Sequence, residues 1–97
     1  MPQIQKEGQD FLENNESKLS LKLILNYLNE QNIEKLEKSK AKEIINQISK
    51  MNNVKKGILM KSLRVAFFGS LSGPDLIQSW ELFSEIKSDK SRIERCL

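Results

Sequence analysis

Apolar residues recur along this chain at the spacing of an α-helix, and no segment shows the sustained alternation of a half-buried strand. The clearest case is the set Leu21, Ile24, Leu25 and Leu28, which lie at i, i+3, i+4 and i+7. An apolar stripe of this kind must be buried against other helices. The sequence therefore predicts an all-α fold, a compact bundle of five to six short helices in a single domain of 97 residues.

Capping residues and helix breakers suggest where each helix begins and ends. A polar first helix is expected over residues 3–14, and a second from an N-cap at Ser17 to about Glu30. A third should run from a cap at Ser39 to about Asn52, before a basic hinge at residues 55–57. A fourth helix is expected over residues 58–68, with its C-cap at Gly69. Pro74 should lie in the first turn of a fifth helix, whose apolar face is Leu76, Ile77, Trp80 and Phe83. Ser88 should cap a last helix that contains Ile93 and Leu97.

Composition argues against an enzyme. The chain has no histidine and one cysteine, Cys96, so the commonest general base and metal ligand are missing and no internal disulfide can form. No nucleophile elbow, P-loop or dinucleotide fingerprint occurs. We therefore expect no catalytic residue, no metal and no cofactor in this chain. Apolar runs such as 65–68 are too short to cross a membrane and no secretory signal is seen, so a cytoplasmic location is expected.

Positive charge is concentrated in the second half. Residues 1–54 hold eight lysines and eight acidic residues, whereas residues 55–97 hold five lysines and three arginines against five acidic residues. The net charge of +3 and every arginine thus belong to the second half. Such a distribution suits a polyanionic partner, although +3 is also ordinary for a protein surface.

The segment RVAFFGSLSGPDL (residues 64–76) is the only corner punctuated by both glycine and proline. Gly69 permits a left-handed turn, and the start of the next helix presents unpaired N–H groups that suit a phosphate or a base edge. Arg64 lies about a turn and a half before Gly69 and could reach this corner. Ser72 adds a hydroxyl, and Leu76 with Ile77 could form an apolar wall for an unstacked base. The simpler interpretation is that the corner only ends one helix and begins another.

The stretch KKGILMKSLRVAFFGSLSGPDLIQSW (residues 55–80) resembles the C-terminal anticodon-binding domain of bacterial glutamyl-tRNA synthetases, and GPDLIQSW is closest to cyanobacterial-type members. The upstream segment SKLSLKLILNYLNE (residues 17–30) is similar to an earlier helix of that family. The matching residues of the longer stretch are Lys56, Gly57, Leu63, Arg64, Ala66, Gly69, Gly73, Pro74 and Leu76.

This resemblance implies that residues 1–97 form a helical cage that receives the splayed anticodon loop of tRNA(Glu). It also implies that Arg64 contacts an anticodon base, and that the loop and helix start line the base pockets. Together with Ser72 from the corner itself, the expected tRNA-binding residues are Arg64, Ser72, Gly73, Pro74, Asp75, Leu76 and Ile77.

Some features depart from the family pattern. Ser62 stands where proline is usual, and Phe67-Phe68 replaces a leucine-threonine pair. The catalytic domain is absent from this sequence, so ATP and Mg²⁺ are expected only in a full-length parent enzyme, whose catalytic part is a second expected partner. The predicted function is recognition of the tRNA anticodon for a glutamate–tRNA ligase, without catalysis by this chain. The alternative is a small helical protein-interaction module that does not bind RNA.

Overall fold

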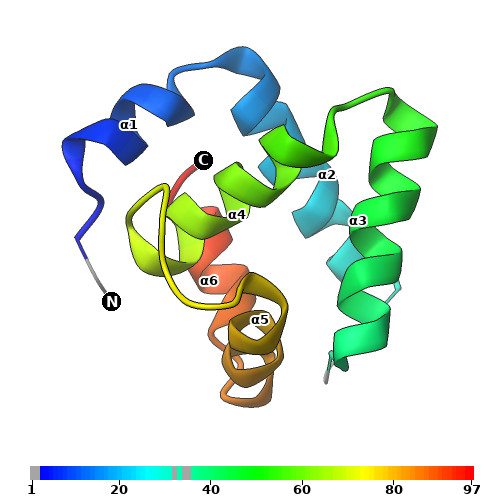
Figure 1. The fold of residues 1–97 in the computed structure, drawn as a ribbon. Coiled ribbons are helices and arrows are strands. Elements are labelled where there is room, and N and C mark those ends of the chain that lie inside the picture. The colour runs from blue at the N-terminus through cyan, green and yellow to red at the C-terminus, as the bar shows by residue number, and fades with distance from the viewer. Residues whose placement is uncertain (1–2, 32, 34–35) are drawn as a thin grey trace.

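A computed structural model describes residues 3–31, 33 and 36–97. This part of the chain contains six helices and no strand, which confirms the all-α prediction (Figure 1). None of its helices is both long enough and apolar enough to cross a membrane. The helices are α1 (Lys6–Leu12), α2 (Asn15–Glu30), α3 (Lys38–Asn52), α4 (Lys56–Phe68), α5 (Leu76–Glu85) and α6 (Asp89–Glu94).

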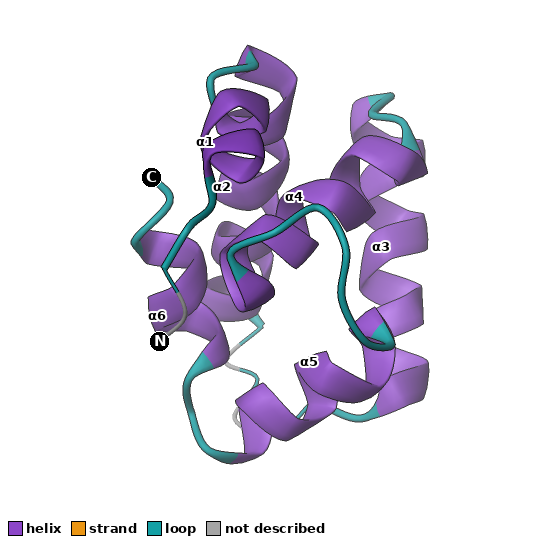
Figure 2. Cartoon of the chain, turned by 60° about the vertical axis from the view of Figure 1, so that its left-hand side comes forward, coloured by secondary structure: helices purple, strands orange, loops and turns teal. Residues whose placement is uncertain are grey.

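Helix α4 is the central element of the bundle, because it packs against each of the other five helices. Figure 2 shows α3 on one side of α4, α5 below it, and the long loop from the end of α4 running across to α5. An apolar sequence makes this position possible: the buried residues of α4 are Leu59, Ser62, Leu63, Val65, Ala66 and Phe67. A central helix needs apolar residues around most of its circumference.

The core is built around two aromatic side chains, Phe67 of α4 and Trp80 of α5, which are both fully buried. Their ring centroids lie 5.9 Å apart, and the Phe83 ring lies 5.3 Å from that of Phe67 in another tilted contact. The Trp80 indole N–H donates to the Asp89 carboxylate over 3.3 Å. The interpretation of Trp80 as a core residue, rather than as part of an exposed patch, is thereby confirmed.

Helix α2 begins earlier than predicted. Asn14 is its N-cap, since the Asn14 side chain accepts a hydrogen bond from the Glu16 N–H over 2.9 Å. The prediction that Ser17 caps this helix is wrong: Ser17 is buried inside α2, and its hydroxyl lies 2.8 Å from that of Ser62 on α4. The end of α2 near Glu30 is confirmed.

Other boundaries also differ from the predictions: α1 spans Lys6–Leu12 instead of residues 3–14, and α6 ends at Glu94, before Leu97. Helix α3 has Glu37 rather than Ser39 at its N-cap position, and α4 begins at Lys56, inside the expected hinge. Helix α5 begins at Leu76 with Asp75 as its cap, so Pro74 precedes the helix instead of occupying its first turn. Ser88 stands at the N-cap position of α6, but its hydroxyl accepts from the Arg92 side chain instead of capping the helix.

The N-terminal segment lies against the end of α4. Gly69 ends this helix in the left-handed conformation, with φ of 74°, as predicted. Its carbonyl accepts a hydrogen bond of 2.7 Å from the Gln5 N–H, and a Cβ at position 69 would collide with the Gln3 carbonyl. Gly69 is therefore required both by its backbone angle and by the close approach of the chain before α1.

Candidate nucleic-acid interface

Arg64 reaches the corner that follows α4. One guanidinium nitrogen, Nη1, donates to the Pro74 carbonyl over 2.9 Å and to the Gly73 carbonyl over a longer 3.4 Å. The side chain is half-buried, so part of the guanidinium still faces solvent. The structure thus joins Arg64 to two of the other residues that the sequence singled out, although ten positions separate it from Pro74.

The loop after Gly69 is shaped by a ring beneath it. A Cβ placed on Gly73 would lie 2.6 Å from Cδ2 of Phe68, so the loop passes directly over the face of this ring. Phe68 itself is half-buried and tilted against Phe83, with 6.2 Å between the ring centroids. Ser72 contributes a local turn, because its N–H donates to the Ser70 hydroxyl over 3.3 Å.

The start of α5 is already occupied by a carboxylate. Asp75 accepts from the Gln78 N–H over 2.9 Å, which satisfies one of the N–H groups at the helix terminus. A negative charge at this position is favourable for the helix and repels a phosphate. Of the two ligands considered from the sequence, a base edge therefore suits this terminus better than a phosphate does.

Leu76 and Ile77 play different parts in the structure. Leu76 is only 1% exposed and packs in the core, so its side chain cannot form the predicted wall for a base. Ile77 is half-buried and remains available for that role. Leu76 can take part only through its backbone. The other predicted site residues on the loop, Ser72, Gly73, Pro74 and Asp75, are all exposed.

Two arginines that the sequence analysis did not place at the site hold the end of α4. Arg92 donates through Nη1 to the Phe67 carbonyl over 2.8 Å, and Arg95 donates through Nη2 to the Ala66 carbonyl over 3.1 Å. The Arg92 guanidinium also lies 4.1 Å from the centroid of the Phe83 ring. Burial, and secondly the charge of Arg95, lowers the pKa of Arg92. Cationic groups at a helix C-terminus stabilise its last carbonyls.

The corner therefore combines guanidinium donors, carboxylate and hydroxyl acceptors, and an apolar side chain on one exposed surface. These groups can bind a planar ligand with polar edges, such as an unpaired nucleobase. The described residues contain no cluster of three or more His, Cys, Asp or Glu side chains that could hold a metal ion. The base contact of Arg64 stays a prediction.

Comparison with known proteins agrees with this chemistry. A family model described as an anticodon binding domain matches residues 2–97. The glutamate–tRNA ligase of Prochlorococcus marinus strain MIT 9215 is 83% identical over 96 residues, which are 99% of this chain and 20% of the relative. The corresponding ligase of strain NATL2A is 45% identical over 95 residues, again covering 20% of its length. The chain thus spans about one fifth of the curated relatives it matches.

Proposed function

The chain belongs to the anticodon-binding domain family, and from that premise we propose that it recognises the anticodon loop of tRNA(Glu) as part of a glutamate–tRNA ligase. The observation that carries the proposal is the pair of hydrogen bonds from Arg64 to the Gly73 and Pro74 carbonyls. These bonds hold an arginine, an exposed loop and a helix start together as one surface. Relatives that align with 99–100% of this chain are named glutamate–tRNA ligase, which supports this role.

Recognition at this corner depends on groups that remain open. Only Nη1 of Arg64 donates to described residues of the loop, so the rest of the guanidinium can donate to a base. The Asp75 carboxylate can accept from a base amino group, as acidic side chains do from cytosine N4. Ile77 can contact the face of a base beside this corner, and loop carbonyls can add further acceptors. Unpaired anticodon bases expose the edges that such groups read.

We assign catalysis to the remaining four fifths of such a ligase, which this chain does not align with. ATP and Mg²⁺ would be bound there, and the catalytic part would be the second partner of this domain, in the cytoplasm. The domain itself would contribute affinity and discrimination between anticodons. In isolation its affinity is expected to be modest, because a few contacts must offset the entropy lost on association.

The test is a titration of the 97-residue chain into fluorescently labelled tRNA(Glu), beside the same tRNA with a substituted third anticodon base, at low and moderate salt. We expect weaker binding to the substituted tRNA and a steep loss of affinity with salt. The Arg64→Gln variant should lose discrimination worth about 1–3 kcal/mol, the value of a bidentate base contact. Lys61→Gln is the matched control, since Lys61 is an exposed cation on the same helix.

Equal binding of both tRNAs by the wild-type chain would contradict anticodon recognition by this domain alone. If Arg64→Gln and Lys61→Gln discriminated equally well, the role of Arg64 would be wrong even though the domain reads the anticodon.

The alternative of a protein-interaction module draws support from Leu82 and Ile86, which are 55% and 68% exposed one turn apart near the end of α5. Salt-insensitive association, abolished by Leu82→Ser, would favour that alternative.

A further inference from the structure

A surface pocket of about 280 Å³ lies next to the corner, where α3, α4 and α5 meet. Its apolar lining comes from one side chain of each helix, Ile45 of α3, Met60 of α4 and Ile77 of α5. Its polar lining is Lys42, Asn46 and Lys56. Pockets for drug-sized ligands begin at about 300 Å³, so this one suits a single flat group rather than a larger molecule.

The pocket and the corner are continuous. Lys56, Met60 and Arg64 are spaced four residues apart on α4 and therefore lie along one face of the helix. On the other side, Ile77 lies in the first turn of α5, directly after the loop whose carbonyls accept from Arg64. A strand of RNA that places one base at Arg64 can thus place its neighbour over Met60 and Ile77.

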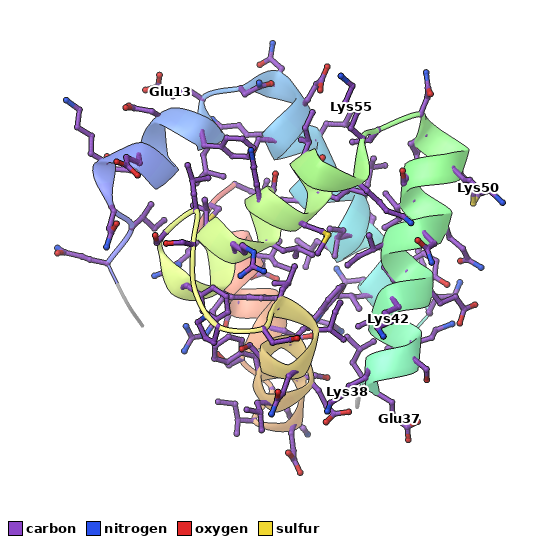
Figure 3. The ribbon with its side chains drawn as sticks, viewed as in Figure 1. Glu13, Glu37, Lys38, Lys42, Lys50 and Lys55 are labelled. Carbon is purple, nitrogen blue, oxygen red and sulfur yellow. The ribbon has the colours of Figure 1, made fainter. Side chains whose placement is uncertain are left out.

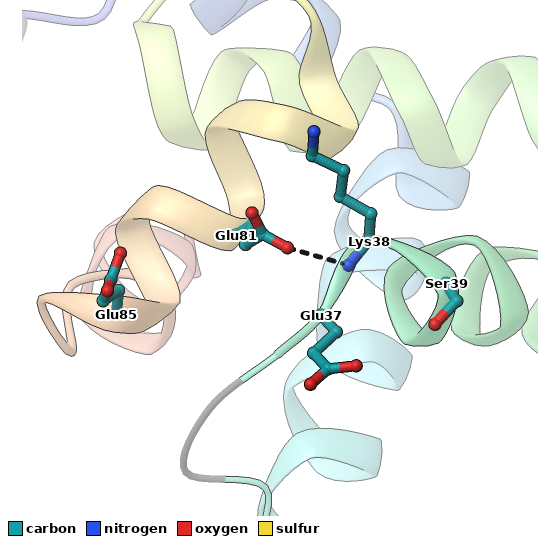
Figure 4. Close-up of a pocket in the computed structure, with 5 residues that line it drawn as sticks. All are labelled: Glu37, Lys38, Ser39, Glu81 and Glu85. Carbon is teal, nitrogen blue, oxygen red and sulfur yellow. Dashed lines mark hydrogen bonds between the residues drawn. The ribbon is translucent and has the colours of Figure 1, made fainter.

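Two separate surface pockets border α3 and α5, and they differ in charge. Figure 4 shows the second one, which is lined by Glu37, Glu81 and Glu85 together with Lys38 and Ser39, and in which Glu81 accepts from the Lys38 backbone N–H over 3.1 Å. With three carboxylates against one lysine, that pocket repels a polyanion, which is attracted instead to the pocket with Lys42 and Lys56. Both of these lysines are exposed, and neither forms an ion pair within the described part of the chain.

Lys40 shows that not every lysine of α3 is equally available. It lies 3.6 Å from the Glu43 carboxylate and 5.7 Å from the centroid of the Tyr27 ring of α2, away from the pocket. Figure 3 shows Lys42, in contrast, on the side of α3 turned toward α5, and Lys50 at the opposite end of α3. The free positive charge beside the pocket therefore belongs to Lys42 and Lys56.

We propose that this pocket binds the nucleotide next to the one held at Arg64, with its base against Ile45, Met60 and Ile77 and its phosphate between Lys42 and Lys56. The Asn46 amide is placed at the rim to hydrogen-bond the edge of the base. This inference rests on the proposed function and assigns to it a second base pocket. A base in an apolar pocket with its phosphate on lysines satisfies both halves of a nucleotide.

A methionine-methyl NMR titration tests the base directly. The chain has three methionines, and Met51, which is 81% exposed beyond the pocket, is an internal control for Met60. An anticodon stem-loop of tRNA(Glu) is added to ¹³C-methyl-methionine protein. We expect the Met60 methyl signal to shift upfield in proportion to saturation, because a base stacked on it imposes a ring current, while the Met51 signal stays in place.

A pair of double variants tests the phosphate. Lys42→Gln with Lys56→Gln removes two cations at the pocket, and Lys22→Gln with Lys50→Gln removes two exposed cations elsewhere. One phosphate neutralised on a single strand contributes about 0.7 to the slope of log K against log salt. The pocket variant should therefore have a slope shallower by about 0.7 than the control variant. Its affinity deficit should accordingly be about 2.6-fold larger at 50 mM salt than at 200 mM.

The two failures are distinguishable. One failure concerns the second pocket alone: the wild-type chain binds the stem-loop with anticodon discrimination, but the Met60 methyl signal does not shift or both double variants have the same salt slope. In that case the second pocket would be wrong and the role of the corner would stand. If the wild-type chain did not bind the stem-loop at all, both proposals would be overturned. Far-UV circular dichroism of each variant confirms that the helices are intact.

Discussion

The contact between Gly73 and Phe68 gives a sharp test of how the loop is shaped. In Gly73→Ala the new Cβ would lie 2.6 Å from Cδ2 and 3.0 Å from Cγ of the Phe68 ring. These atoms are at the base of the ring, so the ring or the loop must move. Overpacking of this kind typically costs about 1–3 kcal/mol. The φ angle of Gly73 is outside the left-handed region, so the backbone itself adds no penalty.

Removing the ring should reverse the sign of the effect. In a Phe68→Ala background the ring is gone, so the Cβ of Gly73→Ala no longer collides with it. Gly73→Ala should then stabilise the protein by about 0.4–1 kcal/mol, as Gly→Ala does at a compatible backbone angle. Phe68→Ala alone should cost less than the about 3–5 kcal/mol of a fully buried ring, because Phe68 is only half-buried. The double-mutant cycle should therefore give a favourable coupling of at least about 1 kcal/mol.

The assay is urea unfolding of the four proteins, followed by circular dichroism and by the fluorescence of Trp80, the single, fully buried tryptophan. Unchanged m-values across the set would show that the same structure is being compared. If Gly73→Ala cost the same free energy in both backgrounds, to within about 0.5 kcal/mol, the ring would not be what excludes a side chain at position 73.

Three further predictions concern the interior. Ser62→Ala should destabilise by about 1–3 kcal/mol because it leaves the buried Ser17 hydroxyl without this partner, and adding Ser17→Ala should recover most of the loss in urea unfolding. Forcing a non-glycine residue into the left-handed conformation costs about 1–2 kcal/mol. Gly69→Ala should lower the free energy of unfolding by more than this, because its Cβ also displaces Gln3. Thermal unfolding at the wild-type temperature would refute this prediction. Burial, opposed by Arg95, raises the pKa of the Cys96 thiol from 9.0. The folded chain then keeps a proton that the unfolded chain loses, so the free energy of unfolding should fall as pH rises past about 9, and Cys96→Ala should remove that part of the decrease.

Much of the fold could be predicted because helical spacing reports burial directly. The stripe that begins with Leu21 and Ile24 lies in the core, and the left-handed end at Gly69 follows from glycine's backbone freedom. Helix starts were harder to predict. Ser17 is of a residue type that often caps helices, but its hydroxyl hydrogen-bonds with that of Ser62, far along the chain, inside the bundle. No local pattern encodes a contact between residues that are 45 positions apart.

The site was predicted less completely for a similar reason. Spacing placed Arg64 near the corner, but its partners are backbone carbonyls whose direction depends on how the loop crosses Phe68. Spacing also put Leu76 on the apolar face of its helix, but whether that face meets the core or a base depends on how α5 packs against the other helices. The pocket beside Lys42 joins three helices, so its lining appears only when their packing is known.

The arginines of α6 also bear on the order of events during synthesis. The Ala66 and Phe67 carbonyls receive their Arg95 and Arg92 partners from a helix that follows α5 in the chain. Proteins emerge from the ribosome with the N-terminal part first, at roughly 5–20 residues per second. A nascent chain that has emerged only through α5 therefore has α4 without these partners. The end of α4, which leads into the loop proposed to read tRNA, is therefore completed only when α6 has emerged and docked.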